Sequence, residues 1–348
     1  MTTDLDSAAG TKPYVVTLGT VGGPRWWRGA TDEHRAGIAT AVVVGDSTYL
    51  VDCGHGVGTQ LTKAGLSVES LRGIFITHLH SDHTVDLGSL TAFGMFDRTA
   101  NQTRMKIIGP GDRGKLPPVS NRTDSAPQPV FAERPTPGIT EMFSNLVAAH
   151  ATDINDRVLD ALRPSPFDLF APEDISIPGR CGFDPNTNPT PPMEPFTIHS
   201  DDRVTVTATL VQHPPVAPAF AFRFDTDGGS VTISGDTAPC DNLVRLASGT
   251  DLLLHEAIDF GWVYRAYGGK GDLAGQASID HHEKSHTSPH DAVAIAHRAG
   301  AKALALHHIV PGHTPRSVWL EAGDEFDGRF LVPKDLDVIP FGALVAAT

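Results

Sequence analysis

The sequence predicts a mixed α/β fold whose strands end in residues of metal-ligand type. Short apolar runs, such as 40–44, 48–51 and 73–76, alternate with stretches of helical character at 57–64 and 85–95. That order is expected of mixed α/β layers. The hydrophobic content of 40% is ordinary for a globular chain. We therefore expect one large domain spanning residues 1–348.

The densest group of polar residues is THLHSDH at 77–83, directly after the apolar run 73–76. Alternate side chains of a regular strand leave on opposite faces, so only a loop at the strand end can aim them all at one place. The first two ligands would share one metal and the last two would reach a second: His78 and His80, then Asp82 and His83. Imidazole and carboxylate together favour two Zn²⁺ ions, with Mn²⁺ or Fe as alternatives.

Four later sites repeat this placement, because each follows an apolar strand candidate. They are His213, Asp236, His308 and the pair His255-Glu256. His307 competes with His308 for a metal, whereas we expect His55, His281 and His282 to be solvated. His286 precedes a helix that begins at Ser288-Pro289, where serine suits the N-cap and proline the first helical position.

The net charge of −14 and the lack of a basic run argue against a surface that wraps nucleic acid. Three scattered cysteines do not form a disulfide framework. The N-terminus has neither the basic start nor the apolar core of a secretion signal, and no later run could span a membrane. We therefore expect a cytoplasmic protein with no membrane partner.

The segment 110–195 differs in composition from the rest of the chain, since it holds 16 of the 27 prolines. Long strands cannot persist there. A helical stretch at 139–162 lies within it. We expect a proline-rich helical insertion, and two interpretations stay open: a surface insertion, or a cap over the site.

Aromatic residues gather in two expected loops. The first follows the Gly/Pro-rich stretch 19–24, and the second is the glycine-rich stretch 257–285. Both loops should flank the metals and could supply rigid, apolar contacts to a substrate. Mutual packing of the aromatics within the loops is the open alternative. The candidate substrate-binding residues are Trp26, Trp27, Trp262, Tyr264 and Tyr267.

The order THLHSDH, a histidine, GDT and a histidine after an apolar strand resembles the metallo-β-lactamase superfamily. HEA followed by SHTSPHDAVAIAHRAGAKALALHHIVPG is similar to its ribonuclease Z and arylsulfatase-like branch. The resemblance implies an αββα four-layer sandwich with a dinuclear site on one rim. It covers most of the chain apart from the proline-rich segment.

Matched position by position, the resemblance implies three ligands for metal one, three for metal two and Asp236 as a bridge. The two sets are His78, His80 and His213, and Asp82, His83 and His308. It also implies that His286, supported by Glu256, stabilises the transition state or protonates the leaving group. Asp82 would also act in catalysis. We expect Asp52 to support a ligand histidine by a hydrogen bond.

Asp236 follows His213 by 23 positions, which leaves no room for the long basic clamp of ribonuclease Z. We therefore expect a zinc-dependent hydrolase acting on a small-molecule ester, either a carboxylic ester, a sulfate ester or a phosphodiester. The expected partners are that small molecule, no nucleic acid, and a second copy in a possible homodimer. The alternatives are a tRNA 3′ endonuclease of ribonuclease Z type and, further away, a redox or non-catalytic member of the fold.

Overall fold

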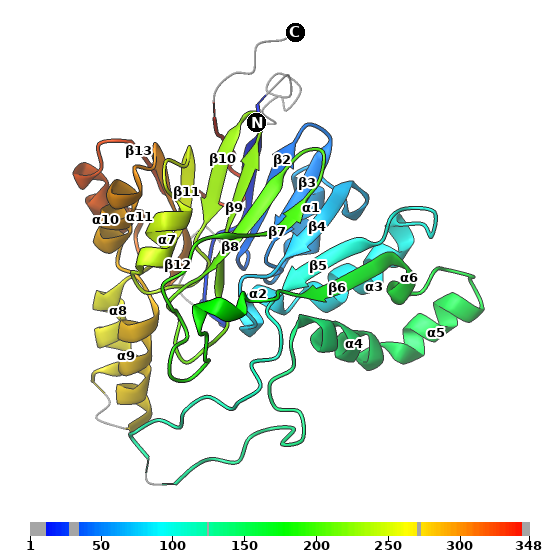
Figure 1. The fold of residues 1–348 in the computed structure, drawn as a ribbon, viewed down its shortest axis with the longest axis horizontal. Coiled ribbons are helices and arrows are strands. Elements are labelled where there is room, and N and C mark those ends of the chain that lie inside the picture. The colour runs from blue at the N-terminus through cyan, green and yellow to red at the C-terminus, as the bar shows by residue number, and fades with distance from the viewer. Residues whose placement is uncertain (1–11, 28–34, 124, 270–272, 343–348) are drawn as a thin grey trace.

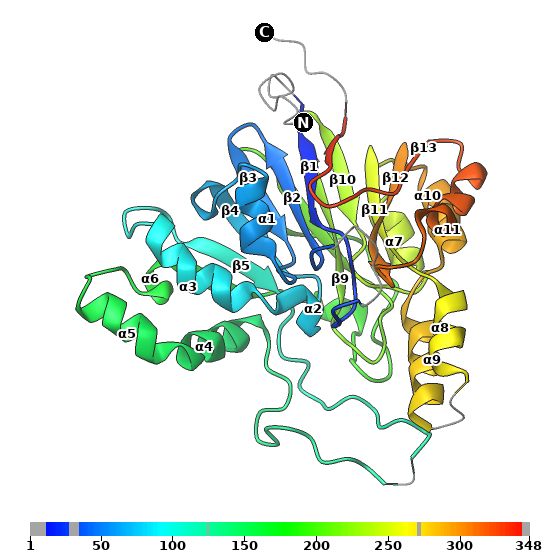
Figure 2. The same cartoon turned by 180° about the vertical axis from the view of Figure 1, so that it is seen from behind.

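Two seven-stranded sheets lie face to face and carry helices on their outer faces, as the resemblance implies (Figure 1 and Figure 2). The computed structural model describes residues 12–27, 35–123, 125–269 and 273–342. Within those residues no helix combines the length and the apolar character that a bilayer crossing needs.

The first sheet joins an antiparallel half to a parallel half, which begins at the pair β3 and β4. Its strands, in spatial order, are β14 (Val338–Pro340), β1 (Tyr14–Gly19), β2 (Ala39–Val44), β3 (Ser47–Val51), β4 (Leu71–Phe75), β5 (Met105–Gly109) and β6 (Phe170–Asp174).

The second sheet has the same division, with a parallel half that begins at the pair β10 and β11. Its strands, in spatial order, are β13 (Arg329–Leu331), β12 (Ala303–Val310), β11 (Leu252–Ile258), β10 (Gly229–Ile233), β9 (Phe220–Thr226), β8 (Thr205–Leu210) and β7 (Phe196–Ser200). Because the carboxyl ends of parallel strands meet at one edge, each sheet offers a row of strand ends for a site.

Helices cover both outer faces of the sandwich. On the first sheet they are α1 (Val57–Lys63), α2 (Ser81–Thr84), α3 (Leu87–Asp97), α4 (Ile139–Ala149), α5 (Ala151–Leu159) and α6 (Pro166–Leu169). The second sheet and its end carry α7 (Asp241–Leu246), α8 (Phe260–Tyr267), α9 (Leu273–Ser285), α10 (Pro289–Ala299) and α11 (Arg316–Leu320). Among the described residues, short 3-10 helices lie at Val68–Ser70, Gly179–Cys181 and Glu321–Glu325.

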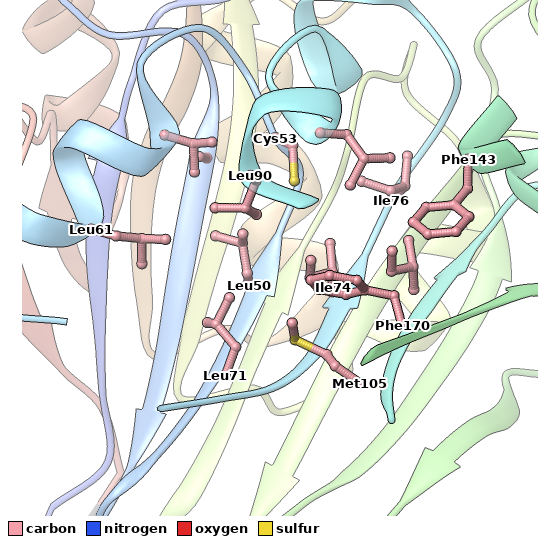
Figure 3. Close-up of a cluster of buried hydrophobic side chains, with 14 of the residues drawn as sticks. Leu50, Cys53, Leu61, Leu71, Ile74, Ile76, Leu90, Met105, Phe143 and Phe170 are labelled. Carbon is pink, nitrogen blue, oxygen red and sulfur yellow. The ribbon is translucent and has the colours of Figure 1, made fainter. Parts of the chain in front are cut away.

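Three apolar layers hold the sandwich together. Aromatic rings fill the layer between the sheets, where Phe75 and Phe224 meet edge to face at 5.3 Å. Figure 3 shows the layer between the first sheet and its helices, with Leu50, Ile74 and Phe143 fully buried. The third layer lies between the second sheet, α7 and α10. Such layers stabilise a fold in proportion to the apolar area removed from water, so the strand ends are rigidly supported.

The proline-rich segment 110–195 divides into parts with different contacts. Its first part, a long connection between β5 and α4, runs from the sheets towards α9 (Figure 1). There Arg122 donates two hydrogen bonds to the Asp280 carboxylate, at 2.9 and 3.1 Å. The next part adds β6 to the first sheet and packs α4 against α3. Whether the segment caps the site stays a prediction.

The expected loop at 257–285 is wrong, because α8 and α9 form a helical pair there. Asp259 caps α8 by accepting a hydrogen bond from the Trp262 amide at 3.0 Å. Val263 and Ile279 bury the shared face of the two helices. Glycine content suggested a loop, whereas the apolar contact between two short helices decides the structure.

Candidate metal centre

Strand β4 delivers the THLHSDH run to the edge of the sandwich. The strand ends at Phe75, and the Thr77 amide then donates to Asp52 Oδ1 at 2.8 Å. His80 is extended, and the chain turns into α2 at Ser81. This change from strand to short helix lets nearby ligands point to one place, as expected for a loop at a strand end.

Four side chains form the first group of ligand atoms, which all lie within 4.8 Å of one another: His78, His80, His213 and Asp236. His80 Nδ1 lies 3.0 Å from His78 Nε2 and 3.3 Å from His213 Nε2. Asp236 Oδ2 faces the same two Nε2 atoms at 3.8 and 3.9 Å. Burial lowers the pKa of His78 and of His213, so both imidazoles keep a lone pair for a metal.

The second group uses the other oxygen of Asp236 and consists of Asp82, His83, Asp236 and His308. Asp236 Oδ1 lies 3.3 Å from His83 Nε2 and 3.1 Å from His308 Nε2. Asp82 Oδ2 is 3.3 Å from the same nitrogen of His308. One carboxylate therefore turns one oxygen to each group, which a single imidazole nitrogen could not do.

Unpartnered buried atoms test whether these groups suit metal ions. His83 Nε2 and Asp236 Oδ1 are buried and have no hydrogen-bond partner among the described residues, although they face each other. Leaving such atoms unpaired costs about 1–3 kcal/mol each. Divalent ions would satisfy them, and a mixed imidazole and carboxylate set suits zinc. The donors therefore fit a dinuclear metal site.

Hydrogen bonds behind two of the candidate ligands fix the direction of their rings. His83 Nδ1 lies 2.8 Å from Asp52 Oδ2, and His213 Nδ1 lies 2.9 Å from the Ser285 carbonyl. In both rings Nδ1 is occupied, so Nε2 is left to face the group. This carboxylate or carbonyl support is typical of metal-binding histidines.

The side chains of His307 and His308 leave β12 in opposite directions. His307 Nε2 contacts Thr40 Oγ1 of the first sheet at 2.9 Å, whereas His308 faces Asp82 and Asp236. His308 adopts a positive φ of 50°, a region that costs a non-glycine residue energy.

Gly22 makes room for the His308 ring. A Cβ atom at Gly22 would lie 2.0 Å from Cε1 of that ring. The neighbouring Gly23 amide donates to Asp82 Oδ2 at 2.8 Å. The glycine loop after β1 therefore contributes to the second group, a role that the sequence analysis missed.

His286 and Glu256 form a buried pair beside the two groups, with His286 Nδ1 at 2.9 Å from Glu256 Oε1. Burial alone would lower the pKa of His286, but the charge and hydrogen bond of Glu256 outweigh it and raise that pKa. Burial raises the pKa of Glu256 as well. We assign the proton to His286, because Glu256 Oε1 then accepts from two donors, Nδ1–H of His286 and the Thr237 amide at 3.0 Å, and such bonds favour the ionised carboxylate.

The expectation that His281 and His282 are solvated is wrong, because both side chains are half-buried. Burial lowers the pKa of His281 to about 4 and that of His282 to about 3. The His281 ring lies 6.4 Å from that of His80 and 5.9 Å from that of His286. Their spacing to His286 was the sequence signal that could have revealed this group.

The five candidate substrate aromatics fall into three environments. Trp262 meets Trp27 at 5.3 Å and Tyr267 at 5.8 Å, so these three pack on one another. Tyr264 is half-exposed and donates to Glu283. Trp26 is 85% exposed. Trp26 and Trp27 also line a cleft of about 1050 Å³ that reaches Asp82.

The fold and the two ligand groups define a hydrolase of the metallo-β-lactamase superfamily. The family model described as "Beta-lactamase superfamily domain" matches residues 142–309, and that of "Anti-Pycsar protein Apyc1" matches residues 38–112.

Within that superfamily the chain belongs to the ribonuclease Z branch. It is 32% identical over 303 residues to ribonuclease Z of Mycobacterium sp. (strain KMS), covering 86% of this chain and 84% of the relative. It is 30% identical over 312 residues to ribonuclease Z of Mycobacterium bovis (strain BCG / Pasteur 1173P2), covering 88% and 92%.

Solved structures show the same fold at lower identity. Human tRNase Z, short form, superposes with a TM-score of 0.61 at 20% identity, covering 95% of this chain and all of that one. The metallo-β-lactamase fold protein YhfI from Bacillus subtilis gives 0.57 at 18% identity, covering 94% and 99%.

These relatives overturn the expectation of a small-molecule substrate and no nucleic acid, because they are ribonucleases. The interval between His213 and Asp236 does hold the short β9–β10 hairpin, as its length predicted. However, the lack of an insertion there and a negative net charge do not exclude RNA, since net charge averages over surfaces that never meet the substrate.

Proposed function

We propose that the chain is a metal-dependent endonuclease of ribonuclease Z type that cleaves precursor tRNA on its 3′ side. The observation that carries the proposal is the pair of ligand groups sharing Asp236 beside the His286–Glu256 pair. It occurs in a chain that aligns with ribonuclease Z over 86% of its length.

The proposed ligands of the first ion are His78, His80, His213 and Asp236, and those of the second are Asp82, His83, Asp236 and His308. Two Zn²⁺ ions, when bound, supply an activated water and polarise a phosphate oxygen. Mn²⁺ or Fe could occupy the same oxygen and nitrogen donors.

The protein's own part is to hold these donors and to move one proton. Asp52 and the Ser285 carbonyl keep the rings of His83 and His213 in place. Glu256 binds Nδ1 of His286, which leaves Nε2 available towards the substrate. As water attacks phosphorus and the P–O bond breaks, His286 gives its proton to the leaving oxygen, a step that general acids accelerate about 10²–10⁴-fold.

The cleft beside Asp82 offers a path for the RNA. Arg25 and Lys63 line it and provide positive charge. The exposed ring of Trp26 offers a face for base stacking, an interaction worth about 1–3 kcal/mol per base. In this proposal a local patch of charge and aromatic surface serves in place of an inserted clamp.

The test is cleavage of a precursor tRNA carrying a 3′ trailer by the zinc-loaded protein. We expect one major cut near the 3′ end of the mature tRNA, and none with Asp236→Ala. Bis(p-nitrophenyl) phosphate serves as a small phosphodiester in parallel. Hydrolysis of that compound without any cleavage of precursor tRNA would overturn the proposal.

A further inference from the structure

A third cluster of ligand atoms lies next to the two groups that share Asp236. It consists of His281, His282 and His286, whose candidate ligand atoms all lie within 4.8 Å of one another. The first two side chains come from the end of α9, and the third follows the helix directly. The spacings His282-x₃-His286 and His281-x₄-His286 are common in zinc sites.

Ring distances show how far this cluster is from a metal-binding geometry. Its three pairs of ring centroids are 5.4, 5.5 and 5.9 Å apart. A zinc–nitrogen bond of about 2.0–2.1 Å and a tetrahedral angle place bound rings roughly 5 Å apart. The histidine rings of the first group are 4.7, 4.8 and 5.0 Å apart. The third cluster therefore needs its rings to approach one another by roughly 0.4–0.9 Å, the most for the pair His281 and His286.

Two of the rings already have the support that metal-binding histidines need. His286 contacts Glu256 through Nδ1, so Nε2 remains for a ligand, as in carboxylate–histidine–metal arrangements. His282 packs against Tyr267 at 5.6 Å and Trp262 at 6.4 Å. Its Nδ1 is buried and has no hydrogen-bond partner among the residues that the structure describes. An unpaired nitrogen of this kind is a strong candidate for an ion.

We propose that His281, His282 and His286 form a third metal site that binds zinc more weakly than the two groups around Asp236. The site has three imidazoles and no carboxylate, and its rings must contract to bind, so it fills after the other two. His281 and His282 are half-buried, which leaves an entry path and a position for water.

Zinc at this site inhibits the enzyme, a consequence that rests on the proposed function. Binding places zinc on Nε2 of His286 and releases the proton of that nitrogen to solvent. The leaving oxygen then loses its proton donor. Activity therefore rises as two equivalents of zinc bind and falls as the third binds.

The test is equilibrium dialysis of the purified protein against Zn²⁺, with metal counted by elemental analysis. We expect three equivalents for the wild-type chain and two for the double variant His281→Asn/His282→Asn. The matched control is His290→Asn, which removes an exposed histidine of α10 that pairs with Glu325. This variant should still bind three equivalents of zinc. Three equivalents in the double variant, or only two in the wild type under excess zinc, overturn the site.

Inhibition is measured separately, with precursor tRNA and with bis(p-nitrophenyl) phosphate. The double variant should need more than about tenfold more zinc for half-inhibition, because it lacks two of the three ligands and loss of a group that merely supports a ligand already costs about 10–100-fold in metal affinity. Equal inhibition of the double variant and the wild type overturns the inhibitory role. The dialysis uses no substrate, so it counts bound zinc whether or not the protein cleaves tRNA. The third site can therefore be tested even if the nuclease proposal fails.

Discussion

The candidate metal centre and the aromatic group differ in what fixes their side chains, although Trp262 packs against His282 of the neighbouring histidine cluster. Candidate ligands such as His78, His83 and His213 are fully buried at the ends of strands. The aromatics Trp27 and Trp262 are held by each other. The sheets therefore determine the ligand positions, whereas mutual packing determines the aromatic ones.

Loss of Asp236 should have the largest effect, because its two oxygens face both ligand groups. We expect Asp236→Ala to lower cleavage by more than about 10³-fold, beyond the typical loss of one general acid. Elemental analysis should show that both metals bind more weakly. Full metal content together with full activity would remove Asp236 from both groups.

His286→Ala should lower kcat by about 10²–10⁴-fold while two zinc equivalents remain. The reason is that the Nδ1 contact with Glu256 orients His286 as a proton donor rather than as a ligand of the two groups. The mutation should lower the rate less for a substrate with a better leaving group, which needs less help from a proton donor. Loss of one of the two metals would instead make His286 a ligand.

The dependence of activity on pH, measured for the wild type and for Glu256→Gln, tests the His286–Glu256 pair. Glu256 raises the pKa of His286, so the protonated donor persists to higher pH and its activity falls as the pH rises through that value. The glutamine variant lacks the charge that raises the pKa. Its alkaline limb should therefore move to lower pH, whereas an unmoved limb would assign the proton to another group.

Gly22→Ala should disturb the second ligand group alone, because the new methyl group would overlap the His308 ring. We expect about 10–100-fold weaker binding of one metal, as for changes next to a ligand. Gly58→Ala is the matched control, since a Cβ there meets nothing within 4 Å. Equal metal affinity in both variants would contradict this prediction. It would show that the loop after β1 can shift to accommodate the methyl group without moving His308.

The smallest effects should separate the packed aromatics from the exposed one. Trp262→Ala should lower the free energy of unfolding by about 1–3 kcal/mol, less than for a fully buried tryptophan. Trp26→Ala should change stability by about 0.5 kcal/mol or less but raise KM for RNA through lost stacking. Thermal unfolding measures the loss of stability of both variants, and cleavage kinetics measure their KM for RNA. A large stability loss in Trp26→Ala together with a raised KM only in Trp262→Ala would contradict this assignment.

Sequence patterns predicted the layers because these depend on local order. Apolar runs predicted strands such as β2 and β4, and the run at 77–83 predicted a turn at a strand end. The structure brings the candidate ligands together from distant strand ends into two groups, and their role as metal ligands stays a prediction. Strand β5 was missed, and the end of β11 was placed too early, because its hydrogen bonds to β12 extend past Glu256.

The remaining features depend on contacts between distant segments. Gly22 approaches His308 across 286 positions of sequence, and no local pattern encodes that distance. The aromatics of α8 suggested a binding loop, but their partners are Trp27 and the face of α9. Substrate class was misjudged for a related reason, since total charge says nothing about where Arg25 and Lys63 lie.

The two oxygens of Asp236 have a thermodynamic consequence for metal loading. Because Oδ1 faces one ligand group and Oδ2 the other, the affinity of either group for an ion should depend on whether the other group is filled. Linkage makes that coupling reciprocal, whichever ion binds first. In a titration the affinity measured for the second ion should therefore differ from that measured for the first.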